Sequence, residues 1–179
     1  MKHYAGKEHN THSLYSNRGE IVSLQRLFIL AIIFPNINHI FQSTVLPVNI
    51  NLAWDAIKNL QLDIIAPDMV SSVAYVSGGE GQVGSQVSIS YKSGDVWKLR
   101  ITEYSERSYT VAYDITETDP AISVTSVSAE FNLFEVTDDD TTYLKWTTTY
   151  SNDVDAQIIS DQKYKKCDFF NAWKNSLKA

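Results

Sequence analysis

The sequence has few of the residues on which many catalytic and metal sites depend. Its 179 residues include one cysteine, Cys167, and no histidine from Ile40 to Ala179. A single cysteine cannot form an internal disulfide. Without histidine, the main body of the chain has no Ser/His/Asp triad, no Cys/His pair and no histidine-ligated zinc. We therefore expect no metal and no cofactor, and a catalyst here would have to use Glu, Asp, Lys, Tyr or Arg.

An excess of positive charge is also absent. The chain has 15 Lys and Arg against 21 Asp and Glu, which gives a formal net charge of -6. Because phosphate binding requires a basic face, this balance argues against nucleic acid as the main partner. The 44% hydrophobic and 20% charged content is typical of one folded domain. The single cysteine suits a reducing compartment, so we expect a cytoplasmic protein.

No hydrophobic run is long enough by itself to cross a membrane. The continuous apolar run Leu27–Phe34 ends at Pro35, whereas a bilayer core requires about 20 residues. Residues 21–41 reach that length only by including polar residues, and no small-x-small cleavage site follows the run. We interpret residues 1–40 as a polar tail plus an apolar leader. An extra helix, a signal peptide and a signal anchor stay open, so membrane contact is expected only through residues 21–41, with membrane anchoring or secretion as the alternative location.

Beyond residue 40 the sequence predicts one short strand followed by two short helices. The β-prone strand covers residues 43–48. The spacing of apolar residues in 52–60 predicts an amphipathic helix capped by Asn51. Pro67 and Asp68 predict the start of a second short helical turn.

Alternating apolar and polar residues then predict six strands joined by short polar turns. The expected strands cover residues 73–77, 83–92, 96–104, 109–116, 122–136 and 142–150. Strands linked so closely form an antiparallel meander. A long helix is predicted over 155–177, with Ile159, Cys167 and Phe170 on or beside its apolar face.

Two motifs invite functional interpretations that their context does not favour. Residues 79–84 spell G-x-G-x-x-G, but a dinucleotide fingerprint requires a following helix, and the alternating sequence after Gly84 predicts a strand. We interpret this motif as a glycine-rich hairpin loop. The acidic run 138–140 lacks the spaced oxygen ligands and the glycine of a calcium loop, so we interpret it as a solvated turn.

Aromatic residues are the most informative group, at 12% of the chain. Trp97, Tyr113, Trp146 and Tyr150 all fall on predicted strands. They suit a plain hydrophobic core. They equally suit the wall of a cavity, since one helix cannot fill the concave side of a wide, curved meander. The pattern leaves both interpretations open.

Three segments resemble the START-like, SRPBCC superfamily, within it the polyketide cyclase/dehydrase and lipid-transport family, relatives of the major pollen-allergen and major-latex proteins. The resemblance covers residues 43–177. The segments that carry it are VLPVNINLAWDAIKNL, GGEGQVGSQVSISYKSGDVWKLRITEYSERSYTVAYDI and AISVTSVSAEFNLFEVTDDDTTYLKWTTTYS. Their order and spacing together are more specific than any one of them.

The resemblance implies an α+β helix-grip fold over residues 41–179. About seven curved antiparallel strands would wrap around the long C-terminal helix, with two short helices after the first strand. It also implies a hydrophobic cavity for a lipid, sterol, polyketide or similar metabolite, without implying one activity. Enzymatic members carry an Arg and a Glu on neighbouring strands, where this chain has Val87 and Lys98 or Leu99. Abscisic-acid receptors carry a gate motif and a latch motif. At the corresponding positions this chain has only Ser93-Gly94 and Thr118-Asp119-Pro120, so the resemblance does not imply that receptor function.

Three functional hypotheses follow. The first is a monomeric carrier or binder of a hydrophobic small molecule. Its expected contacts are Trp97, Leu99, Ile101, Tyr113, Trp146, Tyr150, Ile159, Cys167 and Phe170. The second is a cyclase- or isomerase-like enzyme that uses Glu103 with a tyrosine, Tyr113 or Tyr150, as acid and base. The third is a protein-interaction module whose cavity has collapsed and whose surface has an apolar patch.

Overall fold

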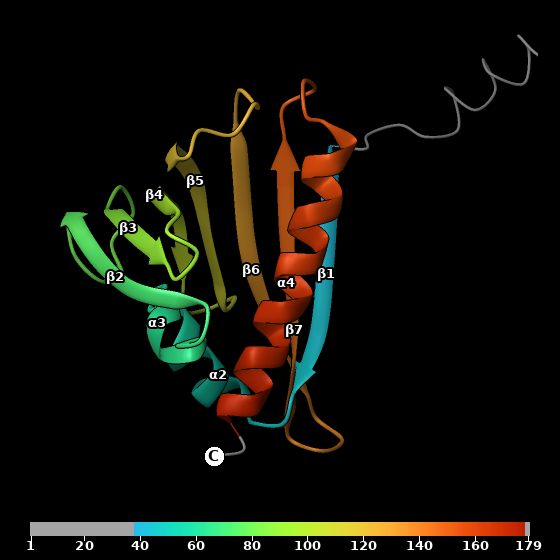
Figure 1. Ribbon diagram of the computed structural model, residues 1–179. Coiled ribbons are helices and arrows are strands. Elements are labelled where there is room, and N and C mark those ends of the chain that lie inside the picture. The colour runs from blue at the N-terminus through green and yellow to red at the C-terminus, as the bar shows by residue number, and fades with distance from the viewer. Residues whose placement is uncertain (1–37, 178–179) are drawn as a thin grey trace, which may run out of the picture. The chain divides into compact units, whose positions relative to one another are not determined.

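The computed structural model describes residues 38–177, so the tail and leader predicted for residues 1–40 lie almost entirely outside the described part. Within it, seven antiparallel strands form one open sheet in the order β1-β7-β6-β5-β4-β3-β2 (Figure 1). The strands are β1 (His39–Leu46), β2 (Val70–Ser77), β3 (Gln86–Tyr91), β4 (Val96–Ser105), β5 (Thr110–Asp119), β6 (Val127–Val136) and β7 (Thr141–Tyr150).

Helices cover one face of this sheet. The long helix α4 (Ala156–Ser176) lies along the face, and the short helices α2 (Ile50–Ile57) and α3 (Leu62–Ile65) lie near its C-terminal end (Figure 1). Among the described residues, none of these helices is both long enough and apolar enough to span a membrane. The α+β architecture predicted from the sequence is confirmed, including the two short helices after the first strand.

The two short helices differ in detail from the prediction. Helix α2 is capped by Asn49, whose Oδ1 accepts a hydrogen bond from Leu52 N at 3.1 Å, and not by Asn51. The earlier start places Ile50 on the buried face of the helix. The prediction that Pro67 and Asp68 open the second helix is wrong. Helix α3 ends before Pro67 because a proline disfavours helical geometry in the residue preceding it.

Helix α4 begins after Asp155, whose side chain accepts a hydrogen bond from Gln157 N at 2.8 Å. Its buried residues recur at helical spacing along one stripe: Ile159, Lys166, Phe169, Phe170 and Trp173. The expectation that Cys167 lies on the inner face is wrong, because Cys167 is exposed. The prediction placed the inner face too far toward Cys167, whereas the buried stripe passes through Lys166.

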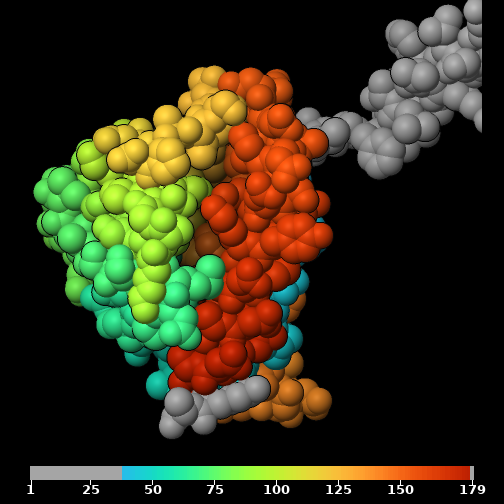
Figure 2. Space-filling view, viewed as in Figure 1, coloured from blue at the N-terminus to red at the C-terminus, as the bar shows by residue number. Residues whose placement is uncertain are grey.

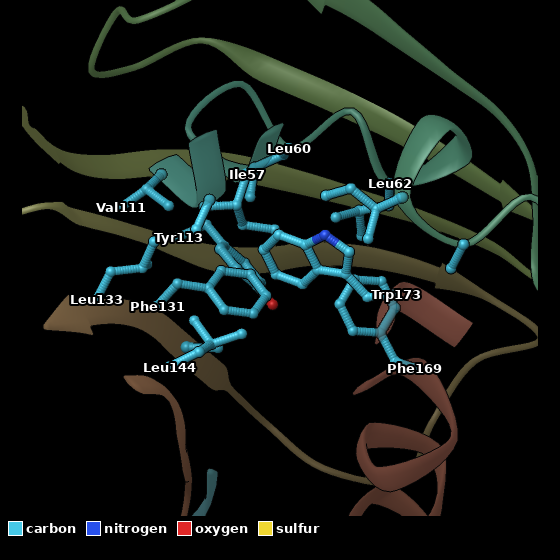
Figure 3. Close-up of a cluster of buried hydrophobic side chains, with 14 of the residues drawn as sticks. Ile57, Leu60, Leu62, Val111, Tyr113, Phe131, Leu133, Leu144, Phe169 and Trp173 are labelled. Carbon is cyan, nitrogen blue, oxygen red and sulfur yellow. The ribbon is translucent and has the colours of Figure 1, made fainter. Parts of the chain in front are cut away.

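The strands place alternate side chains on the helix-covered face. In β6, for example, Val127, Ala129, Phe131 and Leu133 are buried. This strand begins five residues later than the expected residue 122. A larger hydrophobic cluster joins the sheet to all three helices, and Figure 3 shows Phe169 and Trp173 of α4 within it beside Leu62 of α3. The core therefore lies between the concave sheet and its helices.

Candidate functional site

A chain of aromatic rings crosses the concave face of the sheet. The Tyr113 and Phe131 ring centroids lie 6.2 Å apart, those of Phe131 and Trp146 4.5 Å apart, and those of Trp146 and Phe169 5.3 Å apart. Strand alternation places the first three rings on the inner face, and α4 adds the fourth. Ala129 pairs with Tyr113 across the sheet, and its small side chain leaves space beside these rings. The packing between sheet and helix is therefore incomplete at this point.

A cavity of about 290 Å³ lies beside these rings, and Tyr113, Trp146 and Phe169 line it. Its size is close to the lower end of the range for small-molecule sites, about 300–1,000 Å³. The cavity lies between the sheet, α4, and the loops that precede β2 and join β3 to β4. Its lining residues are Leu62, Asp68, Met69, Ile89, Tyr91, Lys92, Ser93, Asp95, Trp97, Leu99, Tyr113, Trp146, Gln162, Lys165, Lys166 and Phe169.

The mouth of the cavity lies between α4 and the β3–β4 turn, where Figure 2 shows the surface to be hollowed. The exposed lining residues Asp68, Lys92 and Ser93 gather there. Lys165 Nζ lies 4.0 Å from Asp95 Oδ2, which links α4 to the turn. Both side chains are partly solvent-exposed, so this ion pair is weak. The mouth is polar, whereas the interior is aromatic and aliphatic.

A second, smaller cavity of about 20 Å³ continues inward from the first. It has room for about one water molecule. The two cavities share five lining residues: Trp97, Tyr113, Trp146, Gln162 and Lys166. Tyr150 and Thr148 line only the smaller one. The shared residues therefore form the inner end of the site.

Lys166 is the one charged residue at this inner end, within the described part of the chain. Its side chain is buried with 3% of its surface exposed. Nζ donates a hydrogen bond to the Thr148 hydroxyl and lies 4.8 Å from the centre of the Trp146 ring. No described carboxylate lies within 4.0 Å of it. Desolvation therefore lowers the pKa of Lys166 from 10.5 to about 7.

The other polar groups of the interior are neutral. Burial raises the pKa of the Tyr113 hydroxyl well above its usual value, and it does the same for Tyr91 and Tyr150. The buried Nε1 of Trp146 makes no hydrogen bond to a side chain or backbone group of residues 38–177. These groups can orient a ligand through hydrogen bonds, but a neutral phenol with a raised pKa is a poor general base.

Four of the nine residues expected to contact a ligand line the main cavity: Trp97, Leu99, Tyr113 and Trp146. Tyr150 lines the smaller cavity. Ile101 and Phe170 are buried in the main hydrophobic cluster, and Ile159 in a second cluster near the start of α4, and none of these three lines either cavity. Cys167 is exposed, with Sγ 3.7 Å from Gln42 Oε1 on β1.

Glu103, the candidate catalytic base, is exposed and lines neither cavity. Strand alternation from Leu99 and Ile101 would place Glu103 on the inner face. The pairing of β4 with β5 is shifted between Ile101 and Glu103, so one extra residue changes the side on which the following residues lie. The enzymatic hypothesis therefore lacks support, because its candidate base, Glu103, does not face the cavity.

Sequence reasoning missed Lys166, Phe169 and Gln162. Helical spacing from Ile159 reaches position 166 after two turns, so the periodicity contained the signal for Lys166. The signal was overlooked because lysine is rarely buried without a partner. Phe169 follows from the same spacing, but Phe170 beside it is equally apolar, and sequence alone does not separate the two.

The glycine-rich and acidic motifs have structural roles. Gly84 is followed by β3 and not by a helix, which confirms the hairpin interpretation. Ser85 Oγ closes this loop by accepting a hydrogen bond from Gly79 N at 3.0 Å and donating one to Gly79 O at 2.8 Å. The acidic run 138–140 lies in the β6–β7 turn. Residues 38–177 contain no cluster of His, Cys, Asp or Glu that would hold a metal ion.

Solved structures share this architecture, although no family model and no curated protein sequence matches the chain. Major latex-like protein 151 from Panax ginseng aligns with TM-score 0.62 and 16% identity over 78% of this chain and 93% of its own. Ara h 8.0201 aligns with TM-score 0.64 and 19% identity over 79% and 98%. A protein from Nitrosospira multiformis aligns with TM-score 0.67 and 20% identity over 76% and 94%. The chain therefore has the helix-grip fold, which confirms the predicted resemblance at the level of the fold.

Proposed function

We propose that this protein binds or carries a hydrophobic small molecule in the cavity between the sheet and α4. The observation that carries the proposal is the cavity of about 290 Å³ with walls of Trp97, Leu99, Tyr113, Trp146 and Phe169. Burial of apolar ligand surface at about 25 cal/mol per Å² would supply the affinity. Polar groups are few and lie at defined points of the wall, which is the usual composition of a small-molecule site.

The two alternatives have weaker support. The enzymatic hypothesis uses Glu103 as its base, and Glu103 is exposed and lines neither cavity. A collapsed interaction module would have a filled interior, whereas this interior contains a cavity. Binding without chemistry is the function that these observations favour.

Native mass spectrometry of the purified protein tests the proposal. We expect a small hydrophobic molecule to co-purify at near one-to-one stoichiometry, and extraction would identify its class. Leu99→Trp places a large side chain in the cavity and should abolish this adduct, while Val76→Trp, at an exposed position on β2, should retain it. A folded protein that carries no adduct and takes up no hydrophobic dye would contradict the proposal.

A further inference from the structure

Among the described residues, the cation at the inner end of the cavity has no carboxylate within 4.0 Å. Lys166 is buried, yet its described neighbours are a hydroxyl and an indole ring, and neither carries a negative charge. An uncompensated buried ammonium costs several kcal/mol, and an apolar residue of similar size at this position would avoid that cost. The position is therefore best suited to a lysine that gains its partner from a bound molecule.

The groups around Lys166 can donate hydrogen bonds, although the hydroxyl and the amide can also accept them. Trp146 Nε1 is buried without a partner, Thr148 Oγ1 is a hydroxyl, and the Gln162 amide lines both cavities. Of residues 38–177, no acidic one lines the smaller cavity. In the main cavity the acidic residues are Asp68 and Asp95; Asp68 is exposed, and Asp95 forms its ion pair with Lys165 at the mouth. The mouth also has cations, Lys92 and Lys165, but both are exposed to solvent, so a charge-assisted hydrogen bond to an anion would be shielded from water only at Lys166.

We propose that the site takes an amphipathic monocarboxylate, whose carboxylate accepts hydrogen bonds from Lys166 and whose apolar tail fills the main cavity. This inference rests on the proposed function, because it specifies the class of ligand for the same site. Charge-assisted hydrogen bonds to an ammonium are stronger than neutral ones, so they would distinguish an acid from an alcohol of the same length. The net charge of -6 gives no general attraction for anions, and Lys166 is the buried cation in the lining that would provide the selectivity.

Isothermal titration calorimetry at pH 6 with octanoate and 1-octanol tests the inference, because the two probes share one tail and differ in the head group. We expect the protein to bind octanoate about tenfold more tightly than octanol. Lys166→Met keeps the size and apolar stem of the side chain but removes the ammonium, and it should abolish the preference for octanoate over octanol. Lys163→Met, at an exposed position on the same helix, should retain the preference.

The possible outcomes separate this inference from the proposed function. If both probes bind the wild-type protein with equal affinity, the cavity accepts apolar ligands but the carboxylate assignment is wrong. The assignment is also wrong if the preference for octanoate survives in Lys166→Met. If neither probe binds the folded protein, the proposed function fails together with the inference.

Discussion

At the scale of single residues, the buried ammonium of Lys166 links stability to pH. Its pKa is about 7 in the folded protein against 10.5 for an exposed lysine. Between these values the unfolded chain binds more protons than the folded one, so the contribution of this group to stability rises with pH. Below about pH 7 both states are protonated, and the folded protein carries the full cost of the buried charge.

Lys166→Met should therefore stabilise the protein most at low pH. We expect its free energy of unfolding to exceed that of the wild type by about 1–4 kcal/mol at pH 6, and the difference to shrink toward pH 9.5. Urea denaturation at several pH values measures this difference. Lys163→Met, whose side chain is exposed, should follow the wild type at every pH. A constant difference from pH 6 to 9.5 would show that Lys166 is not desolvated.

At the scale of elements, the glycine-rich loop between β2 and β3 depends on Gly78. This residue has φ +75°, and an added Cβ would collide with the side chain and backbone of Ser85. Gly78→Ala should destabilise the protein by about 1–3 kcal/mol in urea denaturation. Gly94→Ala is the matched control, because Gly94 has φ +97° but open space around its Cα. Equal losses in the two variants would show that the clash adds nothing to backbone strain.

Two adjacent phenylalanines of helix α4 have different surroundings. Phe169 lines the cavity, whereas Phe170 is equally buried but does not. Phe169→Leu should weaken the binding of a hydrophobic dye more than Phe170→Leu, since only the first changes the wall of the site. Fluorescence titration compares the two affinities, and urea denaturation confirms that both variants are folded. An equal loss of affinity would contradict the assignment of Phe169 to the wall.

The sequence predicts elements more reliably than the orientation of their residues. Alternation and short polar turns define β2 to β7 to within a few residues, except at the start of β6, because the hydrophobic pattern is a local property. Glu103 and Cys167 were misplaced for separate reasons. A register shift that periodicity does not contain turns Glu103 outward, and Cys167 depends on which helix face meets the sheet. The lining of the site depends on strand register and on the orientation of helix α4, so only part of it could be predicted.

At the scale of the whole molecule, the cavity is a property of the sheet and helix together. Its volume depends on the curvature of seven strands and on the depth at which α4 packs against them. Register shifts in the β2–β3 and β4–β5 pairings increase local twist and bend, and the hydrophobic pattern of the sequence did not predict them. The aromatic residues indicated a core and a cavity equally well. In the structure Trp97, Tyr113 and Trp146 line the main cavity, and Tyr150 lines the smaller one.

The described fold predicts where an independent folding unit begins. Strand β1 starts at His39, pairs with β7 along its whole length, and is preceded by Asn38, whose side chain donates a hydrogen bond to Tyr150 O at 2.9 Å. A chain of residues 38–179 keeps every described strand and helix, so we expect it to fold and to unfold in one cooperative transition in urea. A chain that starts at Thr44 loses most of β1, including buried Ile40, and should be clearly less stable. A large loss of stability in the 38–179 chain would show that the first 37 residues contribute to the folded domain.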